Sequence, residues 1–259
     1  MVNLIRTAAL AVDMTTQESV DGAGPVSGQL VRHGTGVQSN RAFPTENHSR
    51  HLDPFVLAER FYIDPDDGFP MHPHKGFEIV SYMFSGGMAH EDSLGVSHTA
   101  YEGDAMHITT GGGIRHSEMP ADGAACNGLQ LWVNLARDEK DRDPEYADAD
   151  AADLPTESVD GATITTVVGD GSPLTTHTDI EYLDIDVSES WTWSVRENWT
   201  GFVYGVSGTG TVDGHDFAEG DVYTITDGTD VELDGDFRVV VVAGEPHDEA
   251  IQQRGPFVL

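Results

Sequence analysis

The chain has 259 residues and a formal net charge of −32, from 45 acidic and only 13 basic residues. This length allows one large domain or two domains of ordinary size. Phosphate contact needs clustered lysine and arginine, and the sequence contains no such cluster, which argues against direct nucleic-acid binding. Strong acidity is typical of salt-adapted proteins, because concentrated salt screens the self-repulsion of the surface.

No targeting or anchoring segment is evident in the sequence. The N-terminal run LIRTAALAV (4–12) is short, contains an arginine and lacks a convincing cleavage site, so we do not expect a signal peptide. No apolar run approaches the roughly 20 residues that span a bilayer, so no membrane association is expected. The single cysteine, Cys126, excludes an intrachain disulfide and fits a reducing compartment. These features predict a cytoplasmic protein.

Short β-rich runs, separated by glycine, aspartate and asparagine, follow one another along most of the chain. The clearest runs are FEIVSYMF (77–84), GLQLWVNL (128–135), ATITTVV (162–168), YLDIDV (182–187), GFVYGV (201–206) and FRVVVVAG (237–244). Short strands at near-regular spacing, with turn residues between them, predict an all-β sandwich or barrel.

One acidic stretch, residues 137–155, loses this strand pattern and holds most of the helix-forming residues of the chain. Pro144 suits the first turn of a helix, and Pro155 suits the position just after one. We therefore predict two β domains, 1–137 and 156–259, joined by a short, partly helical linker at 138–155.

The two predicted domains share a faint internal repeat. In each, a strand, a glycine turn and a second strand precede the tripeptide EGD, at 102–104 and again at 219–221, and a further strand follows. Nine of the 12 histidines lie between residues 33 and 116. If the two copies share an ancestor, only the first copy keeps a metal site.

Two motifs in the first domain carry metal-ligating residues. HPHKGFE (72–78) places His72 and His74 two residues apart, and GGGIRHSEMP (111–120) does the same for His116 and Glu118. Residues at i and i+2 of a strand point to the same face. Three imidazoles and a carboxylate suit iron, manganese, copper, nickel or zinc. Glu78 has the same parity as His72 and His74, so it is an alternative carboxylate ligand.

The remaining candidates are weaker. The run Gly111, Gly112 and Gly113 fits either a plain turn or a close approach of the backbone to a metal. His90 and His107 are candidates for lining the pocket. The other polar residues near or beyond these motifs are expected to be turn, structural or exposed residues: Glu91, Asp92, His98, His177, His215 and His247.

Five strings, in the expected order, resemble the pirins, which are bicupins, proteins of two jelly-roll β-barrel domains. They are HPHKGFE, MAHEDS (88–93), GGGIRHSEMP, GLQLWVNL and GEPHDEAIQQRGPFVL (244–259). The resemblance runs from residue 53 to the C-terminus and implies an iron-binding N-terminal cupin and a metal-free C-terminal cupin. Two nearby positions, Lys75 in place of the usual arginine and His107, depart from the family pattern.

The resemblance implies that His72, His74, His116 and Glu118 are the metal ligands, with Glu78 as a carboxylate near them. It implies one divalent metal, Fe(II) first, with manganese, nickel, copper or zinc as alternatives. The implied activity is that of quercetin 2,3-dioxygenase, in which a flavonol or related aromatic enol reacts with O₂ and Glu118 or Glu78 accepts the substrate proton.

Two other functions are compatible with the same sequence. One is a non-enzymatic, metal- or redox-responsive regulator that acts through a protein partner, and the other is a metal-stabilised bicupin without activity. Similarity of fold does not choose among them.

Overall fold

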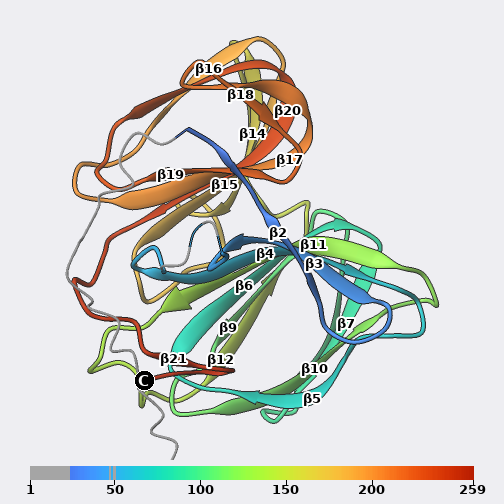
Figure 1. Cartoon of the computed structure of the whole chain (residues 1–259). Coiled ribbons are helices and arrows are strands. Elements are labelled where there is room, and N and C mark those ends of the chain that lie inside the picture. The colour runs from blue at the N-terminus through green and yellow to red at the C-terminus, as the bar shows by residue number, and fades with distance from the viewer. Residues whose placement is uncertain (1–23, 47, 49–50) are drawn as a thin grey trace, which may run out of the picture.

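A computed structural model describes residues 24–46, 48 and 51–259, so the N-terminal run 4–12 lies outside the described residues. The described chain contains 22 strands and no helix. The predicted all-β class is confirmed. Figure 1 shows two β domains, one above the other, with the early strands in the lower domain and the late strands in the upper one. No helix in the described part is long and apolar enough to cross a membrane.

Two antiparallel sheets build the first domain. One has seven strands in the order β12-β9-β6-β11-β4-β3-β2, and the other has four in the order β5-β10-β7-β8. In chain order, these strands are β2 (Gln29–Arg32), β3 (Val37–Phe43), β4 (Phe55–Ile63), β5 (Phe69–His74), β6 (Phe77–Ser85), β7 (Gly87–Asp92), β8 (Ser97–Tyr101), β9 (Ala105–Thr109), β10 (Ile114–Pro120), β11 (Cys126–Asn134) and β12 (Glu145–Ala149).

A nine-stranded antiparallel sheet builds the second domain, in the order β1-β19-β17-β20-β15-β14-β13, with β16 beside β20 and β18 beside β17. Its strands are β1 (Val26–Ser27), β13 (Thr156–Val159), β14 (Ala162–Val168), β15 (Ile180–Val187), β16 (Ser190–Ser194), β17 (Thr200–Val212), β18 (His215–Ala218), β19 (Asp221–Ile225) and β20 (Asp230–Gly244). All six runs predicted from the sequence are strands, and both EGD tripeptides lie at the turns that precede β9 and β19.

The prediction of a partly helical linker is wrong. Residues 137–141 form turns, and 145–149 form β12, which pairs with β9 at the edge of the seven-stranded sheet. Tyr146 packs with the first domain's apolar clusters. Backbone pairing and burial of one aromatic side chain here outweigh the helix propensity of the flanking alanines and acidic residues, which is a weak preference.

The two domains are joined by apolar packing and by exchanged segments. The largest buried cluster combines residues of β6 and β11, such as Val80 and Leu131, with residues of β17 and β20, such as Phe202 and Val242. In addition, β1 pairs with β19 of the second domain. The hairpin of β21 (Gln253–Arg254) and β22 (Phe257–Val258) returns to the first domain (Figure 1), where Phe257 forms a β-bridge with Lys75. The boundaries 1–137, 138–155 and 156–259 stay a prediction, and the sheets cross them.

Candidate metal centre

Two neighbouring strands bring three histidines together. In the pairing of β10 with β5, His116 lies opposite His72, and Ile114 lies opposite His74. One ring nitrogen from each of His72, His74 and His116 lies within 4.8 Å of the other two. Nε2 of His116 is 3.1 Å from Nε2 of His72. The i, i+2 spacing therefore puts the imidazoles on one face, as predicted.

Backbone carbonyls select the tautomer of two of these rings. Nδ1 of His72 is 2.9 Å from the carbonyl oxygen of Pro70, and Nδ1 of His74 is 3.4 Å from that of Pro256. A carbonyl oxygen only accepts, so we infer that both Nδ1 atoms carry the proton. The lone pair then lies on Nε2, the atom available to a metal.

Burial keeps two of the histidines neutral. It lowers the pKa of His74 to about 3, and the neighbouring His116 and His72 add to this effect. Burial, together with His72 and His90, lowers the pKa of His116 to about 3 as well. Neutral imidazole is the form that binds a metal. Nδ1 of His116 is buried without a hydrogen-bond partner among the described residues. The clustered imidazoles, of which burial keeps His74 and His116 neutral, fit a transition metal.

Glu118 supplies a carboxylate at the same cluster. It is buried on β10, and its Oε2 is 4.0 Å from Nε2 of His116. The side-chain amide of Gln130 on β11 donates to both carboxylate oxygens, at 3.2 Å each. Nε1 of Trp132 donates to Oε1 of Gln130 at 3.0 Å, which turns the amide nitrogen toward Glu118. This chain of contacts fixes the orientation of the carboxylate.

Gln130 and Trp132 were missed in the sequence, where GLQLWVNL indicated a strand and a family resemblance but no site residue. A signal was present in this run, because Gln130 and Trp132 are two residues apart and therefore share a face. Leu129 and Leu131 point to the opposite face and pack in the cluster between the domains.

His90 belongs to a second, overlapping group. His90, His116 and Glu118 also offer ligand atoms within 4.8 Å of one another. On β7, His90 lies opposite Glu118 of β10. Its Nε2 is 3.3 Å from the buried Asp92 carboxylate, and its ring stacks on Tyr146 at 4.8 Å. His90 therefore lines the cluster. Asp92 is a turn residue, as predicted, because its Oδ1 accepts hydrogen bonds from the amides of Leu94 and Val96, and its side chain is buried beside His90.

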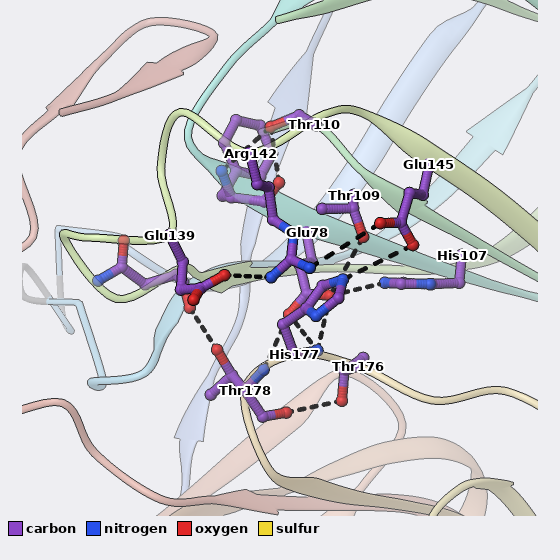
Figure 2. A network of polar contacts seen from close by, with 12 residues as sticks. Glu78, His107, Thr109, Thr110, Glu139, Arg142, Glu145, Thr176, His177 and Thr178 are labelled. Carbon is purple, nitrogen blue, oxygen red and sulfur yellow. Dashed lines mark hydrogen bonds and ion pairs between the residues drawn. The ribbon is translucent and has the colours of Figure 1, made fainter. Parts of the chain in front are cut away.

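Glu78 lies outside the histidine cluster, at the contact between the two domains (Figure 2). Its carboxylate contacts Nε2 of His107 at 2.9 Å and accepts hydrogen bonds from the backbone amides of His177, at 3.0 and 3.1 Å, and Thr178, at 3.1 Å. Burial raises the pKa of Glu78, but these partners outweigh it and hold the pKa below its ordinary value. Glu78 and His107 thus join the first domain to residues 177–178 of the second.

The strand parity that would place Glu78 beside the histidines is therefore wrong. β5 ends at His74 and β6 begins at Phe77, and Gly76, with φ +86°, lies between them. This turn resets the alternation, so that Phe77 packs against His74, with ring centroids 5.4 Å apart. Glu78, the next residue, points to the opposite face.

The glycine run forms a turn between β9 and β10 and packs against protein backbone. Gly111 has φ +44°, and a Cβ at this position would lie 2.2 Å from the carbonyl oxygen of Arg142. Its close approach is thus to Arg142, which supports the plain-turn interpretation. Lys75 points away from the cluster and pairs with Asp141 at 2.9 Å.

The histidines expected outside the site are indeed apart from it. His177 and His247 lie at the contact between the domains, where His177 pairs with Glu145 at 3.8 Å and His247 lies 3.0 Å from the carbonyl oxygen of Asn134. His215 is exposed, and His98 lies 3.9 Å from Asp148.

A cavity of about 390 Å³ opens beside the cluster. Its lining includes His72, His74 and Glu118, apolar walls and a second polar group on β3 and β4. The C-terminal hairpin closes one side. The full lining is His33, Arg41, Leu57, Glu59, Phe69, His72, His74, Glu118, Gln130, Trp132, Gln253, Gly255 and Pro256. Val258 anchors the hairpin, because its side chain is fully buried and its amide donates to the carbonyl oxygen of Lys75 at 2.9 Å.

Replacing Gln130 with alanine is expected to lower metal affinity by about 10- to 100-fold, because ligand-orienting hydrogen bonds have effects of this size. Titration of the metal-free protein with Fe(II) under anaerobic conditions measures the change. Gln38→Ala, an exposed position on β3, is the matched control. Equal affinities of the two variants would show that Gln130 does not orient Glu118.

Sequence comparisons identify relatives along most of the chain. Residues 36–133 match the Pirin family, and residues 182–259 match the Pirin C-terminal cupin domain. Pirin from Rattus norvegicus is 38% identical in an alignment 224 residues long that covers 80% of this chain and 77% of the relative. Pirin from Homo sapiens is 37% identical, over 81% of this chain and 78% of the relative.

Solved structures give the same result for the fold. A quercetin 2,3-dioxygenase from Acinetobacter baumannii superposes with a TM-score of 0.83 at 26% identity, over 92% of this chain and 91% of that chain. The bacterial pirin YhhW from Escherichia coli, solved in complex with nickel(II), has a TM-score of 0.71 at 22% identity, over 85% of this chain and 95% of that chain. At 22% identity, the similarity to YhhW concerns the fold alone. The chain belongs to the pirin family, and its two β domains are the paired cupins of that family.

Proposed function

We propose that this pirin holds one divalent transition metal on His72, His74, His116 and Glu118, and that this metal is Fe(II). We further propose that it catalyses a dioxygenase reaction of the quercetin 2,3-dioxygenase type. The single observation that carries the proposal is a cluster of three imidazoles, with the buried Glu118 carboxylate 4.0 Å from His116, beside a cavity large enough for a small aromatic molecule. The quercetin 2,3-dioxygenase among the similar structures supports the reaction type.

The cavity suits a flat ligand. Leu57, Phe69 and Trp132 form apolar walls, and Trp132 stacks on Phe77 at 4.3 Å, which holds the indole in place. Such walls exclude water and bind an aromatic ring by burial of apolar surface. The substrate expected here is a flavonol or a related aromatic enol that enters with its vicinal oxygens toward the histidines.

Bound iron would supply Lewis acidity and redox chemistry with O₂. The protein's part is to bind the enol, orient it and accept its proton. Glu118 lies at the cluster and is the carboxylate placed to take that proton on an Oε atom, a general-base role. The Gln130 amide keeps Glu118 oriented toward the cavity. Glu78 takes no part, because its carboxylate is bound at the contact between the domains.

The proposal is tested by adding a flavonol to metal-loaded protein. Without O₂, we expect the flavonol absorption band to shift on binding, and with O₂ we expect the band to bleach with matched oxygen uptake. The His72→Ala protein is expected to show neither signal. The predicted small aromatic substrate and O₂ are thereby tested together.

The outcomes separate the candidate functions. A band shift without bleaching would favour the regulator, a site that binds ligand without turnover. The absence of both signals with iron, manganese, nickel and copper would remove the flavonol proposal. The cytoplasmic location and the salt adaptation stay predictions from composition.

A further inference from the structure

A second polar group lines the same cavity, away from the histidines. Glu59 lies on β4, and Arg41 lies opposite it on β3. Three donors converge on one oxygen of Glu59: Oγ of Ser39 at 2.9 Å, Nε of Arg41 at 2.9 Å and Nη2 of Arg41 at 2.8 Å. Oε1, the other oxygen, has one contact within the described residues, Nε2 of His33 at 3.6 Å. Nη1 of Arg41 makes no hydrogen bond with any of the described residues.

This polar group occupies a definite place relative to the metal centre. Glu59 lies directly opposite Gln130 of β11, the residue that orients Glu118. Neighbouring strands are about 4.8 Å apart, so the backbone of Arg41 lies about 10 Å from that of Gln130, across two strand spacings. A ligand made of two linked aromatic ring systems extends over such a distance.

The charges of the group limit what it binds. Burial raises the pKa of Glu59, but His33 and Arg41 outweigh it and keep the pKa below its ordinary value, so the carboxylate is ionised at neutral pH. The Arg41–Glu59 pair is neutral as a whole. A carboxylate on the ligand would meet the charge of Glu59, whereas a hydroxyl can donate to Oε1 and accept from Nη1.

We propose, on the basis of the proposed function, that Glu59 and Arg41 determine substrate specificity by binding a hydroxyl group on the end of the aromatic ligand that is remote from the metal. Glu59 accepts the hydroxyl proton in a hydrogen bond, Arg41 donates to the hydroxyl oxygen, and no bond is made or broken. The substrate class is thus a neutral, flat aromatic enol with a distal phenol, and ligands with a distal carboxylate are rejected.

Three flavonols test this preference without any substitution. Galangin, kaempferol and quercetin share the same vicinal oxygens and carry no, one and two hydroxyls on the distal ring. Their affinities for metal-loaded protein are measured without O₂ by the shift of the flavonol band. A hydrogen bond to a charged group predicts that kaempferol and quercetin bind about 10- to 100-fold more tightly than galangin.

The Glu59→Gln protein is expected to bind the three flavonols within about threefold of one another, because the charged acceptor is lost. Asp184→Asn is the matched control, since Asp184 is a buried carboxylate that pairs with Arg238 in the second domain and should leave the preference unchanged. If Glu59→Gln does not fold, Arg41→Lys keeps the ion pair but removes the forked donor, and it should reduce the preference by a smaller factor.

The results separate this inference from the function on which it rests. Equal affinities of the wild-type protein for all three flavonols would overturn the role of Glu59 and Arg41 and leave the flavonol proposal standing. A preference that persists in Glu59→Gln would also overturn it. No band shift with any flavonol would overturn both.

Discussion

Replacing His74 with alanine is expected to lower the affinity for Fe(II) by at least about 100-fold. Removing a residue that only orients a metal ligand already lowers metal affinity by up to about 100-fold, and His74 is itself a proposed ligand. The wild-type chain is expected to bind one metal. Among the described residues, both groups of side chains that could hold a metal ion lie between His72 and Glu118, in the first domain. Anaerobic titration, with metal analysis of the purified protein, measures the affinity and the stoichiometry.

His215→Ala is the control, since it removes an exposed imidazole in the second domain. It should keep the wild-type affinity and one metal per chain. Two metals per wild-type chain, or full occupancy of the His74→Ala protein, would contradict the proposed centre. Loss of metal in Glu118→Gln but not in His90→Ala would support the proposed ligand set, because Glu118 belongs to that set and His90 does not.

Replacing Glu78 with alanine is expected to lower the free energy of unfolding by roughly 3–5 kcal/mol, the usual cost of removing one partner from a buried charged network. The substitution leaves the buried amides of His177 and Thr178 and the side chain of His107 without their acceptor. Urea unfolding at neutral pH measures the loss. Glu145, an exposed member of the same network, lies 3.9 Å from Arg142 and is the matched control (Figure 2). Glu145→Ala should cost no more than about 1 kcal/mol.

The contribution of Glu78 also predicts a pH dependence. Its pKa in the folded protein is lower than in the unfolded chain, so the unfolded chain binds the proton first as pH falls. The stabilisation is complete above the unfolded value, near 4.5, and is lost as pH falls through the lower folded value. Wild-type protein should therefore lose stability faster than Glu78→Gln below about pH 4.5. Parallel acid curves would show that Glu78 is not the group involved.

The sequence allowed the strands and much of the site to be predicted, because these depend on local patterns. Short β-rich runs between turn residues marked strands such as β14, whose bounds match the predicted run 162–168. The i, i+2 spacing put His72 and His74 on one face, and the same spacing brought His116 and Glu118 to the cluster. The helix expected at 138–155 failed because the edge of a sheet was available to that segment, which local propensity does not reveal.

Glu78 shows where local reasoning ends. Its parity with His72 and His74 holds only if one strand is continuous, and Gly76, with φ +86°, breaks the strand. Whether a glycine turns the chain depends on what packs around it, here the carbonyl of Val258, which lies 2.0 Å from the position of a Cβ on Gly76. Val258 is 182 residues away from Gly76 in the sequence.

The sequence by itself determined the all-β class, the paired domains and the candidate metal ligands, since each depends on residue type and short spacing. Only the tertiary structure brought Glu118, and not Glu78, close to the histidines, and it placed Gln130, Trp132, Glu59 and Arg41 around one cavity. It also brought the carbonyl of Pro256 to His74, 182 residues away in the sequence. The physical reason is that side chains from distant strands meet only when the sheets have closed and the register between strands is fixed.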